Sequence, residues 1–366
     1  MKARRLDQGE FEACSEEWKR VLAKDTRATI FDTWEWYATY WRHHRKGELH
    51  VLAVTDNGKP LAFAPLFMET KNFMGLAIKR ISFLGTDRSD YGRFITSNGT
   101  GLECLAAIVE YFNREYTGWD IIDLRNVPAS SELLQIGNIL SKKWRLEVSP
   151  ASVCRYLRIT DWTRFLSAIP ENDRGHIARA ERHLDGQRGI EIHTTKSLEQ
   201  LEDDFNEFMR LHLLRKGQAS AFAGFKERGF LNDVVRTFMA EGWLDLTFLS
   251  KHAVNASAIL GFKFGRKYYS YISGLDNAVR NNKEGLGMVH HTYLVRRAFR
   301  DGFEEFDFLR GDEQYKRRWA NSVRRNYHIT IGNTKPYSLF PVLANTLAKN
   351  RYAGSMYRVL HGSPRQ

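Results

Sequence analysis

Apolar residues recur at helical spacing along much of the chain. The clearest stretch is 197–217, in which Leu201, Phe205 and Phe208 lie three or four positions apart. Gly217 ends this stretch in the position of a helix cap. The same spacing predicts further helices over 8–24, 30–44, 101–116, 133–144, 162–186, 229–242 and the later part of 281–302.

Runs of β-branched and aromatic residues predict strands between these helices. Residues 48–69 hold two such runs on either side of Asn57-Gly58, which is typical of a hairpin with a two-residue turn. Further strands are predicted over 79–85, 119–127, 151–160, 243–252, 256–276, 303–311 and 326–331. This order of elements indicates a mixed α/β or α+β fold.

The two halves of the chain repeat one another in pattern. Residues 51–69 resemble 246–271, and 119–127 correspond to 303–311, each of the latter pair following a helix. We therefore expect two related α/β units in tandem. The expected domains are 1–160, 161–335 and a basic amphipathic tail over 336–366.

Composition describes a globular protein with a basic balance. The 366 residues are 43% hydrophobic, and 55 Lys+Arg against 43 Asp+Glu give a net charge of +12. This composition excludes a disordered chain. The charge leaves three partners open: nucleic acid, an anionic membrane surface or a phosphate-rich ligand. The absence of long basic runs and of zinc-finger spacing disfavours a dedicated nucleic-acid-binding module.

No membrane-spanning or secretory segment is expected. No apolar run reaches the ~18 residues that a spanning helix needs, and the N-terminus lacks the apolar core of a secretory signal. We therefore expect a cytoplasmic protein. The tail over 336–366 is expected to dock on its domain, or alternatively to contact a membrane surface.

Adjacent histidines and a glycine loop are the first candidates for chemistry. His43–His44 and His290–His291 lack the spacing of metal ligands, so we expect no metal. Gly285-Leu286-Gly287 opens a helix, where free backbone N–H groups favour an anion such as a pyrophosphate. The loop has neither the lysine of a Walker A motif nor a Rossmann fingerprint.

Several longer segments carry a family resemblance. They are LHLLRKGQASAF (211–222), YYSYISGLD (268–276), the glycine loop, FDFLRGDEQYKRRW (306–319) and, upstream, SDYGRF (89–94). With these segments the chain resembles the GNAT superfamily. More narrowly, it resembles the CelD-like acetyltransferases of cellulose and exopolysaccharide biosynthesis, which are relatives of the FemAB aminoacyl transferases.

The resemblance implies tandem GNAT-like folds with mixed, mostly antiparallel sheets flanked by helices. It also implies direct acyl transfer from acetyl-CoA, or another acyl-CoA, to a sugar or polysaccharide precursor. The implied acid–base residues are His212, Asp312 and Tyr315. The implied donor-binding residues are Tyr271, Ile272, Ser273, Gly274, Asn282, Gly285, Leu286 and Gly287. The implied acceptor-binding residues are Asp90, Tyr91, Arg179, Lys316 and Trp319.

One departure from the family pattern keeps two alternatives open. The pyrophosphate loop of the family typically begins with Gln or Arg, and this chain has Asn282 there. The first alternative is a FemAB-like transferase that takes an aminoacyl group from tRNA, which the net charge of +12 also favours. The second is a non-catalytic relative that acts as a scaffold.

Overall fold

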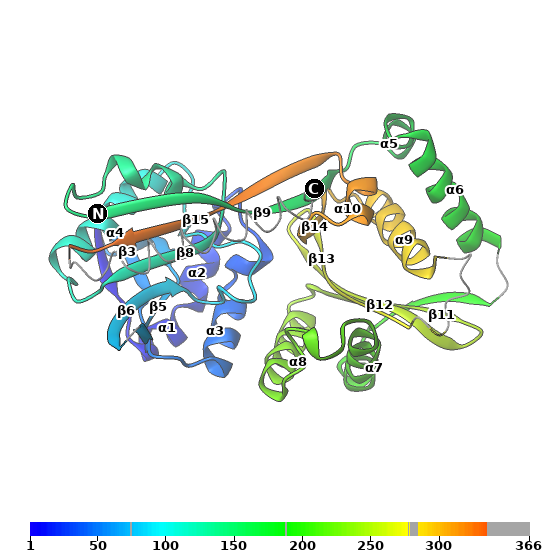
Figure 1. Ribbon diagram of the computed structural model, residues 1–366, viewed down its shortest axis with the longest axis horizontal. Helices are drawn as coiled ribbons and strands as arrows, with labels where there is room; N and C mark the ends of the chain where they lie inside the picture. The colour runs from blue at the N-terminus through cyan, green and yellow to red at the C-terminus, as the bar shows by residue number, and fades with distance from the viewer. Residues whose placement is uncertain (74, 187–188, 277, 279–284, 335–366) are drawn as a thin grey trace, which may run out of the picture. The chain divides into compact units, whose positions relative to one another are not determined.

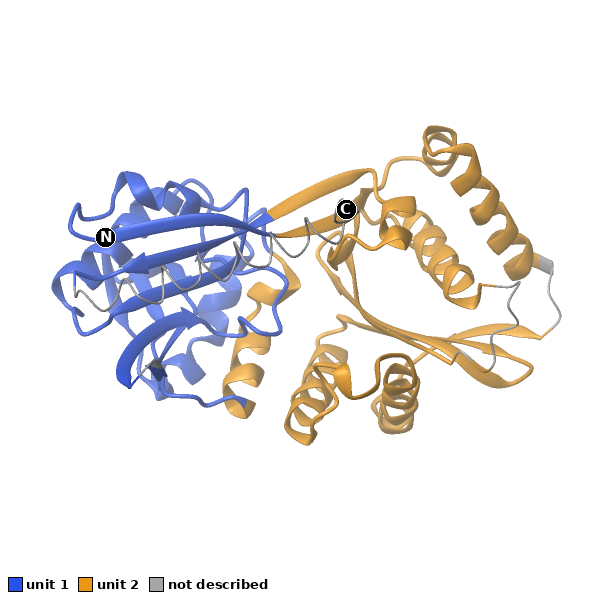
Figure 2. Cartoon of the chain, in the orientation of Figure 1, with its two compact units in different colours: residues 1–28, 44–151, 326–366 blue, residues 29–43, 152–325 orange. Residues whose placement is uncertain are grey.

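The protein consists of two compact units. The computed structural model describes residues 1–73, 75–186, 189–276, 278 and 285–334 (Figure 1). Unit 1 comprises 1–28, 44–151 and the described residues from 326 onward, and unit 2 comprises 29–43 and 152–325 (Figure 2). The chain therefore passes between the units after residues 28, 43, 151 and 325, whereas the sequence predicted one boundary near 160. Asn282 and the predicted tail lie outside the described residues.

The elements of unit 1 follow the predicted order. Its strands are β1 (Lys2–Arg5), β2 (Glu48–Leu49), β3 (Leu52–Asp56), β4 (Lys59–Ala64), β5 (Leu66–Phe73), β6 (Leu76–Phe83), β7 (Ile95–Thr96) and β8 (Ile121–Pro128). Its helices are α1 (Gln8–Ala13), α2 (Ser15–Leu22), α4 (Gly101–Arg114) and the 3₁₀ helix η2 (Glu132–Asn138). Two long strands, β9 (Arg145–Arg158) and β15 (Ser322–Gly332), contain crossings between the units.

Unit 2 carries most of the remaining helices. Its strands are β10 (Ile190–Thr194), β11 (Leu244–Lys251), β12 (Val254–Phe264), β13 (Lys267–Leu275) and β14 (Glu305–Arg310). Its helices are α3 (Trp34–His43), α5 (Trp162–Ala168), α6 (Glu171–Gly186), α7 (Leu198–Lys216), α8 (Phe225–Ala240), α9 (Leu286–Arg300), α10 (Gln314–Trp319) and the 3₁₀ helices η1 (Ile30–Asp32) and η3 (Gly217–Ala219).

Unit 1 is built from two sheets around one core. The strands β1, β3, β4 and β7 form an antiparallel sheet, and β2, β5, β6, β8 and β15 form the second. The β3–β4 turn has Asn57 at φ 48° and Gly58 at φ 77°, as a two-residue hairpin turn requires. Trp119, Ile81 and Phe112 belong to the buried cluster that joins the sheets to α4.

Unit 2 is a twisted sheet covered on both faces. The strand order is β10-β11-β12-β13-β14-β9, antiparallel except for the parallel pair β13–β14. Helices α7 and α8 cover one face, and α9, with α6 packed against it, covers the other (Figure 1). Val295 of α9 packs in one buried cluster with Ile259 of β12 and Phe306 of β14.

The units share one arrangement of strands. In each, an antiparallel pair (β5–β6 or β12–β13) leads through a helix (α4 or α9) to a parallel strand (β8 or β14). The strand that closes each unit comes from the other half of the sequence: β15 pairs with β8, and Cys154–Arg158 of β9 pair with β14. The predicted tandem α/β organisation is thus confirmed.

The predicted helices over 8–24 and 162–186 are each divided into two, at residue 14 and at 169–170, and the one over 133–144 is wrong. Residues 133–144 form no α-helix; instead Glu132–Asn138 is a 3₁₀ helix followed by a turn. Leu133 and Ile136 are its buried residues, and their spacing of three suits 3.0 residues per turn. Gly137 within this segment also weakens an α-helix.

Candidate functional site

The candidate site lies where β13 and β14 separate. These parallel strands pair over Lys267–Tyr269 and Glu305–Asp307, and β13 then continues to Leu275 without a β14 partner in the described strands. The β12–β13 register shifts beside Tyr271, which adds a bulge at the same place. A pocket of about 200 Å³ lies beside this last part of β13, at Ser273–Leu275.

Five elements of unit 2 supply the pocket wall. The lining residues are Arg215 of α7, Ser257 of β12, Ser273, Gly274 and Leu275 of β13, Gly287, Met288 and His291 of α9, and Tyr315, Arg318 and Trp319 of α10. Ser273, Gly274, Gly287, Tyr315 and Trp319 were predicted as site residues. Arg215, Ser257, Leu275, Met288, His291 and Arg318 were not.

His212 holds the β13 backbone in place. Its Nδ1–H donates to the Ser273 carbonyl (3.0 Å), so Nε2 is the acceptor for the Ser220 hydroxyl (2.6 Å). Burial lowers the pKa of His212. A Cβ on Gly274 would approach the His212 backbone nitrogen to 2.6 Å, so only glycine permits this contact. Both ring nitrogens of His212 are thus engaged within unit 2, so His212 positions the strand, and its acid–base role stays a prediction.

His291 offers the free proton acceptor of the pocket. Its Nδ1–H donates to the Gly287 carbonyl (2.8 Å), and Nε2 has no hydrogen-bond partner among the described residues. Burial lowers the pKa of His291 to about 4, so the ring is neutral at pH 7. The sequence held one usable signal: Gly287 and His291 are four residues apart, on one helix face.

Tyr315 faces His291 across the pocket. The two ring centroids lie 5.1 Å apart. Burial raises the pKa of Tyr315 to about 12, so its phenol remains protonated and able to donate at neutral pH. Trp319 is fully buried at the pocket wall and stacks on Phe165.

Two other predicted residues are engaged elsewhere. Asp312 is exposed and bonded to Arg155 and Arg317, which lower the pKa of its carboxyl to about 2. Lys316 is 4% exposed, and its ammonium contacts the Leu309 and Arg310 carbonyls and the Glu313 carboxylate. These contacts engage its ammonium within unit 2, and its acceptor-binding role stays a prediction.

The remaining predicted residues lie around or away from the pocket. Gly285 caps α9 in the left-handed region (φ 55°), and Leu286 is buried. Tyr271 packs in an aromatic cluster with Phe31, Trp36, Phe222 and Phe262, and Ile272 follows it on β13. Arg179 is exposed on α6. Asp90 and Tyr91 are buried in unit 1.

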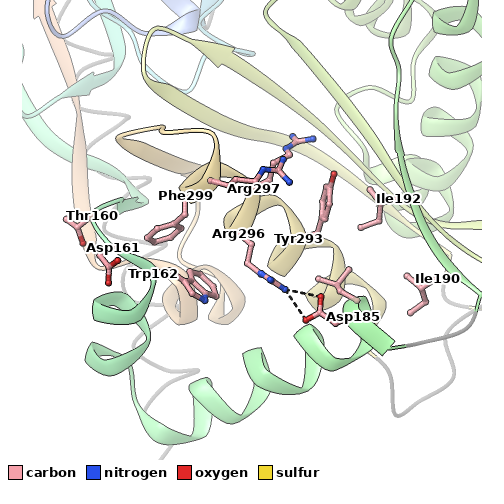
Figure 3. Close-up of a pocket in the computed structure, with 12 residues that line it drawn as sticks. Thr160, Asp161, Trp162, Asp185, Ile190, Ile192, Tyr293, Arg296, Arg297 and Phe299 are labelled. Atoms are coloured by element: carbon pink, nitrogen blue, oxygen red, sulfur yellow. Dashed lines mark hydrogen bonds and ion pairs between the residues drawn. The ribbon is translucent and has the colours of Figure 1, made fainter.

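Unit 2 also contains a larger pocket of about 790 Å³ (Figure 3). Trp162, Asp185, Tyr293 and Arg296 are among its lining residues, and none of the predicted site residues is. We place the chemistry in the smaller pocket, because the neutral imidazole and the protonated phenol meet there.

The described residues offer neither a metal cluster nor a membrane-spanning helix. Among them, no three His, Cys, Asp or Glu side chains come together in a way that would hold a metal ion. No helix in the described part of the chain is long and apolar enough to cross a membrane.

A family model matches most of unit 2. Residues 171–317 match the model of the acetyltransferase (GNAT) domain. This part of the chain is a GNAT acyltransferase domain. The GNAT domain runs from α6 into α10, so it contains His291, Tyr315 and the separated strands of the candidate site. The protein is therefore an acyltransferase, as the sequence predicted.

Solved structures share the fold over nearly the whole chain. FemX aligns with a TM-score of 0.61 at 12% identity, over 90% of this chain and 97% of FemX. L-PGS from Bacillus licheniformis aligns with a TM-score of 0.51 at 11% identity, over 86% and 94% of the two chains. No curated protein matches this chain in sequence. At such identities the likeness establishes the fold alone, and it agrees with the predicted tandem GNAT-like architecture.

A third similar structure is described as the C-terminal domain of a lysylphosphatidylglycerol synthetase from Agrobacterium fabrum. It aligns with a TM-score of 0.55 at 9% identity, over 92% of this chain and 97% of that domain. The tandem organisation of this chain thus recurs in full-length alignments with three solved structures.

Proposed function

We propose that the protein transfers an acyl group, with acetyl-CoA as the first donor to test, directly to an amine or hydroxyl of a sugar or polysaccharide precursor. One observation carries the proposal: a neutral His291 and a protonated Tyr315 line the same pocket, beside the part of β13 that has no β14 partner. The pocket of about 200 Å³ suits a small acyl group and its thioester, with the rest of the donor outside.

The chain's own residues supply both proton transfers. The acceptor oxygen or nitrogen bonds to the acyl carbon, and His291 Nε2 takes the proton that the acceptor loses. The acyl carbon–sulfur bond breaks, and the Tyr315 hydroxyl gives its proton to the leaving sulfur. Transfer of the His291 proton to Tyr315 through water then restores both groups, so the protons balance.

The backbone around the pocket fits the donor. Beyond Tyr269, β13 has no β14 partner in the described strands, so an extended amide-containing arm could pair with its backbone there, except at the Ser273 carbonyl, which accepts from His212. The first turn of α9, including Gly287, presents backbone N–H groups that favour the negative phosphates of a CoA donor.

Calorimetric titration of the full chain with acetyl-CoA and CoA tests the donor, and release of free thiol with glucosamine or an oligosaccharide tests transfer. Tyr315→Phe should lower turnover at least about tenfold. Tyr327→Phe, a partly buried tyrosine of unit 1, should not. Absence of binding at ~1 mM ligand would contradict acyl-CoA as donor.

A second donor is favoured by a specific observation. The fold likeness extends over 97% of FemX, and the net charge is +12. In this case an aminoacyl ester of tRNA would replace the thioester, and His291 and Tyr315 would keep their roles. A tRNA complex that weakens steeply with salt, together with aminoacyl transfer, would support this donor. Acetyl transfer without tRNA would exclude it as the main activity.

A further inference from the structure

The larger pocket of unit 2 lies on a different face of α9 from the reaction pocket. Tyr293, Arg296 and Arg300 recur at steps of three and four, so they share one helix face. At about 100° per residue this face is roughly opposite the one that carries Gly287 and His291. A ligand in the larger pocket therefore does not enter the site of acyl transfer.

Aromatic rings form one part of this pocket. Trp162, Tyr293 and Phe299 are each partly exposed and line the space. Trp162 meets the Phe299 ring edge-on at 5.1 Å, and Figure 3 shows both near Asp161. Exposed aromatic surface of this kind is suited to the apolar face of a flat or ring-shaped ligand.

The charges of the pocket are already matched. Arg296 forms ion pairs with Asp185 (3.4 Å) and Glu181 (3.5 Å). Arg297 pairs with Asp245, and Arg300 pairs with Asp301 (2.9 Å). Every guanidinium of the lining thus has a carboxylate partner. These carboxylates offset the positive charge of the arginines, so the pocket attracts an anion less than three unpaired arginines would.

The Arg296–Asp185 pair places N–H donors beside carboxylate acceptors (Figure 3). A hydroxyl group both donates and accepts, so vicinal hydroxyls on a ring satisfy both partners at once. The rings of Trp162 and Tyr293 suit the apolar face of the same ligand. From this combination we infer that the larger pocket is a non-catalytic binding site for a neutral saccharide.

Such a site goes beyond the proposed transfer reaction, because it holds a glycan at a point remote from the reacting group. The two pockets share α9, and about nine residues separate Gly287 from Arg296, which corresponds to ~14 Å along the helix. An acceptor polymer would be retained by one of its units while another is modified. Binding here needs no acyl donor and can be measured alone.

The test is calorimetric titration of the full chain with cellotetraose and chitotetraose, and with inorganic phosphate and ATP as anionic probes. We expect at least one tetrasaccharide to bind with a Kd of ~0.1–1 mM, and the anions to bind more weakly here. Trp162→Ala should weaken saccharide binding about tenfold. Trp243→Ala removes another partly buried tryptophan of unit 2 outside the pocket and should leave it unchanged.

A second variant keeps the test decisive if Trp162→Ala fails to fold. Asp185→Asn leaves Arg296 with one carboxylate fewer, so saccharide binding should fall and phosphate binding should rise. The inference would be overturned if neither tetrasaccharide bound at ~10 mM, or if both variants left saccharide binding unchanged. Thiol release with a monosaccharide acceptor should persist in Trp162→Ala, so failure of this site and failure of the transfer reaction give different results.

Discussion

The two units share one arrangement of strands and differ in what lies beside the point where the parallel strand pair ends. In unit 2, β13 runs on past its last β14 partner at Tyr269, and a pocket remains. In unit 1, β6 ends at Phe83, soon after its last β8 partner at Ser82. The following loop then bonds to β8, with the Gly92 N–H donating to the Asn126 carbonyl (2.9 Å).

The loop of unit 1 closes the gap with the chain itself. Tyr91 is fully buried, and a Cβ on Gly92 would meet the Arg125 carbonyl at 2.5 Å. The helix N-termini differ as well. At the start of α4, the Glu132 carboxylate lies against Gly101 and pairs with Arg27 (2.5 Å). Unit 1 thus fills with its own groups the two positions at which we propose that unit 2 binds the acyl donor.

The largest expected effect is the loss of turnover when the proton acceptor of unit 2 is removed. His291→Gln keeps a polar side chain of similar size and removes the proton acceptor, so turnover should fall about 100-fold or more. Measured kcat and KM should show the loss mainly in kcat. His193→Gln, an exposed histidine of unit 2 outside the pocket, is the matched control. Turnover within about threefold of the parent would remove His291 from the proposed mechanism.

Matched glycine substitutions test the filled and the open gap. Gly274→Ala and Gly92→Ala each place a Cβ within 2.6 Å of a neighbour, and each should lower the free energy of unfolding by about 1–3 kcal/mol. Transfer per folded molecule should fall in Gly274→Ala only, as urea unfolding combined with the thiol assay would show. Loss of transfer in folded Gly92→Ala would instead favour the predicted acceptor role of Asp90 and Tyr91.

The pH dependence should reflect the buried histidines. Because His291 must be neutral to accept a proton, kcat/KM should fall on the acid side near pH 4, below the ~6.5 of an ordinary histidine. An acid limb near 6.5 would contradict this environment.

Stability should follow the same groups. The folded pKa of His291, about 4, lies below the unfolded ~6.5, so the unfolded state binds more protons in between. Stability should therefore be lost as pH falls from ~6.5 towards 4. Burial lowers the pKa of His50 in unit 1 to about 3, so its contribution declines over a wider range. Urea unfolding at several pH values, with His291→Gln for comparison, would measure this slope.

The smallest effect concerns the helix N-terminus of unit 1. Glu132→Gln removes a carboxylate beside the start of α4 and its pair with Arg27, which should cost at most about 1 kcal/mol. Transfer should be unchanged. Glu103→Gln, an exposed acid in the first turn of α4, is the control. A loss of transfer would show that unit 1 does more than fill its own gap.

Much of the secondary structure could be predicted because local pattern determines it. The Asn57-Gly58 turn and the helix over Leu198–Lys216, ended by Gly217, follow from turn chemistry and apolar spacing. The candidate site could be predicted only where a residue type matched a motif, as with Ser273, Gly287 and Tyr315. The sequence did not predict His291, because the pair His290–His291 lacks metal-ligand spacing and does not indicate which of the two rings lines a pocket.

By itself, the sequence determined the order of helices and strands, the repetition of one α/β pattern and the basic balance, since each depends on neighbouring residues or on composition. Only the tertiary structure decided that β9 and β15 close each other's units, because strand pairing joins residues far apart in the chain. It also decided which polar groups are free. His212 and Lys316 bond to neighbouring groups of unit 2, whereas Nε2 of His291 has no hydrogen-bond partner among the described residues, since burial and hydrogen bonding depend on the packed surroundings.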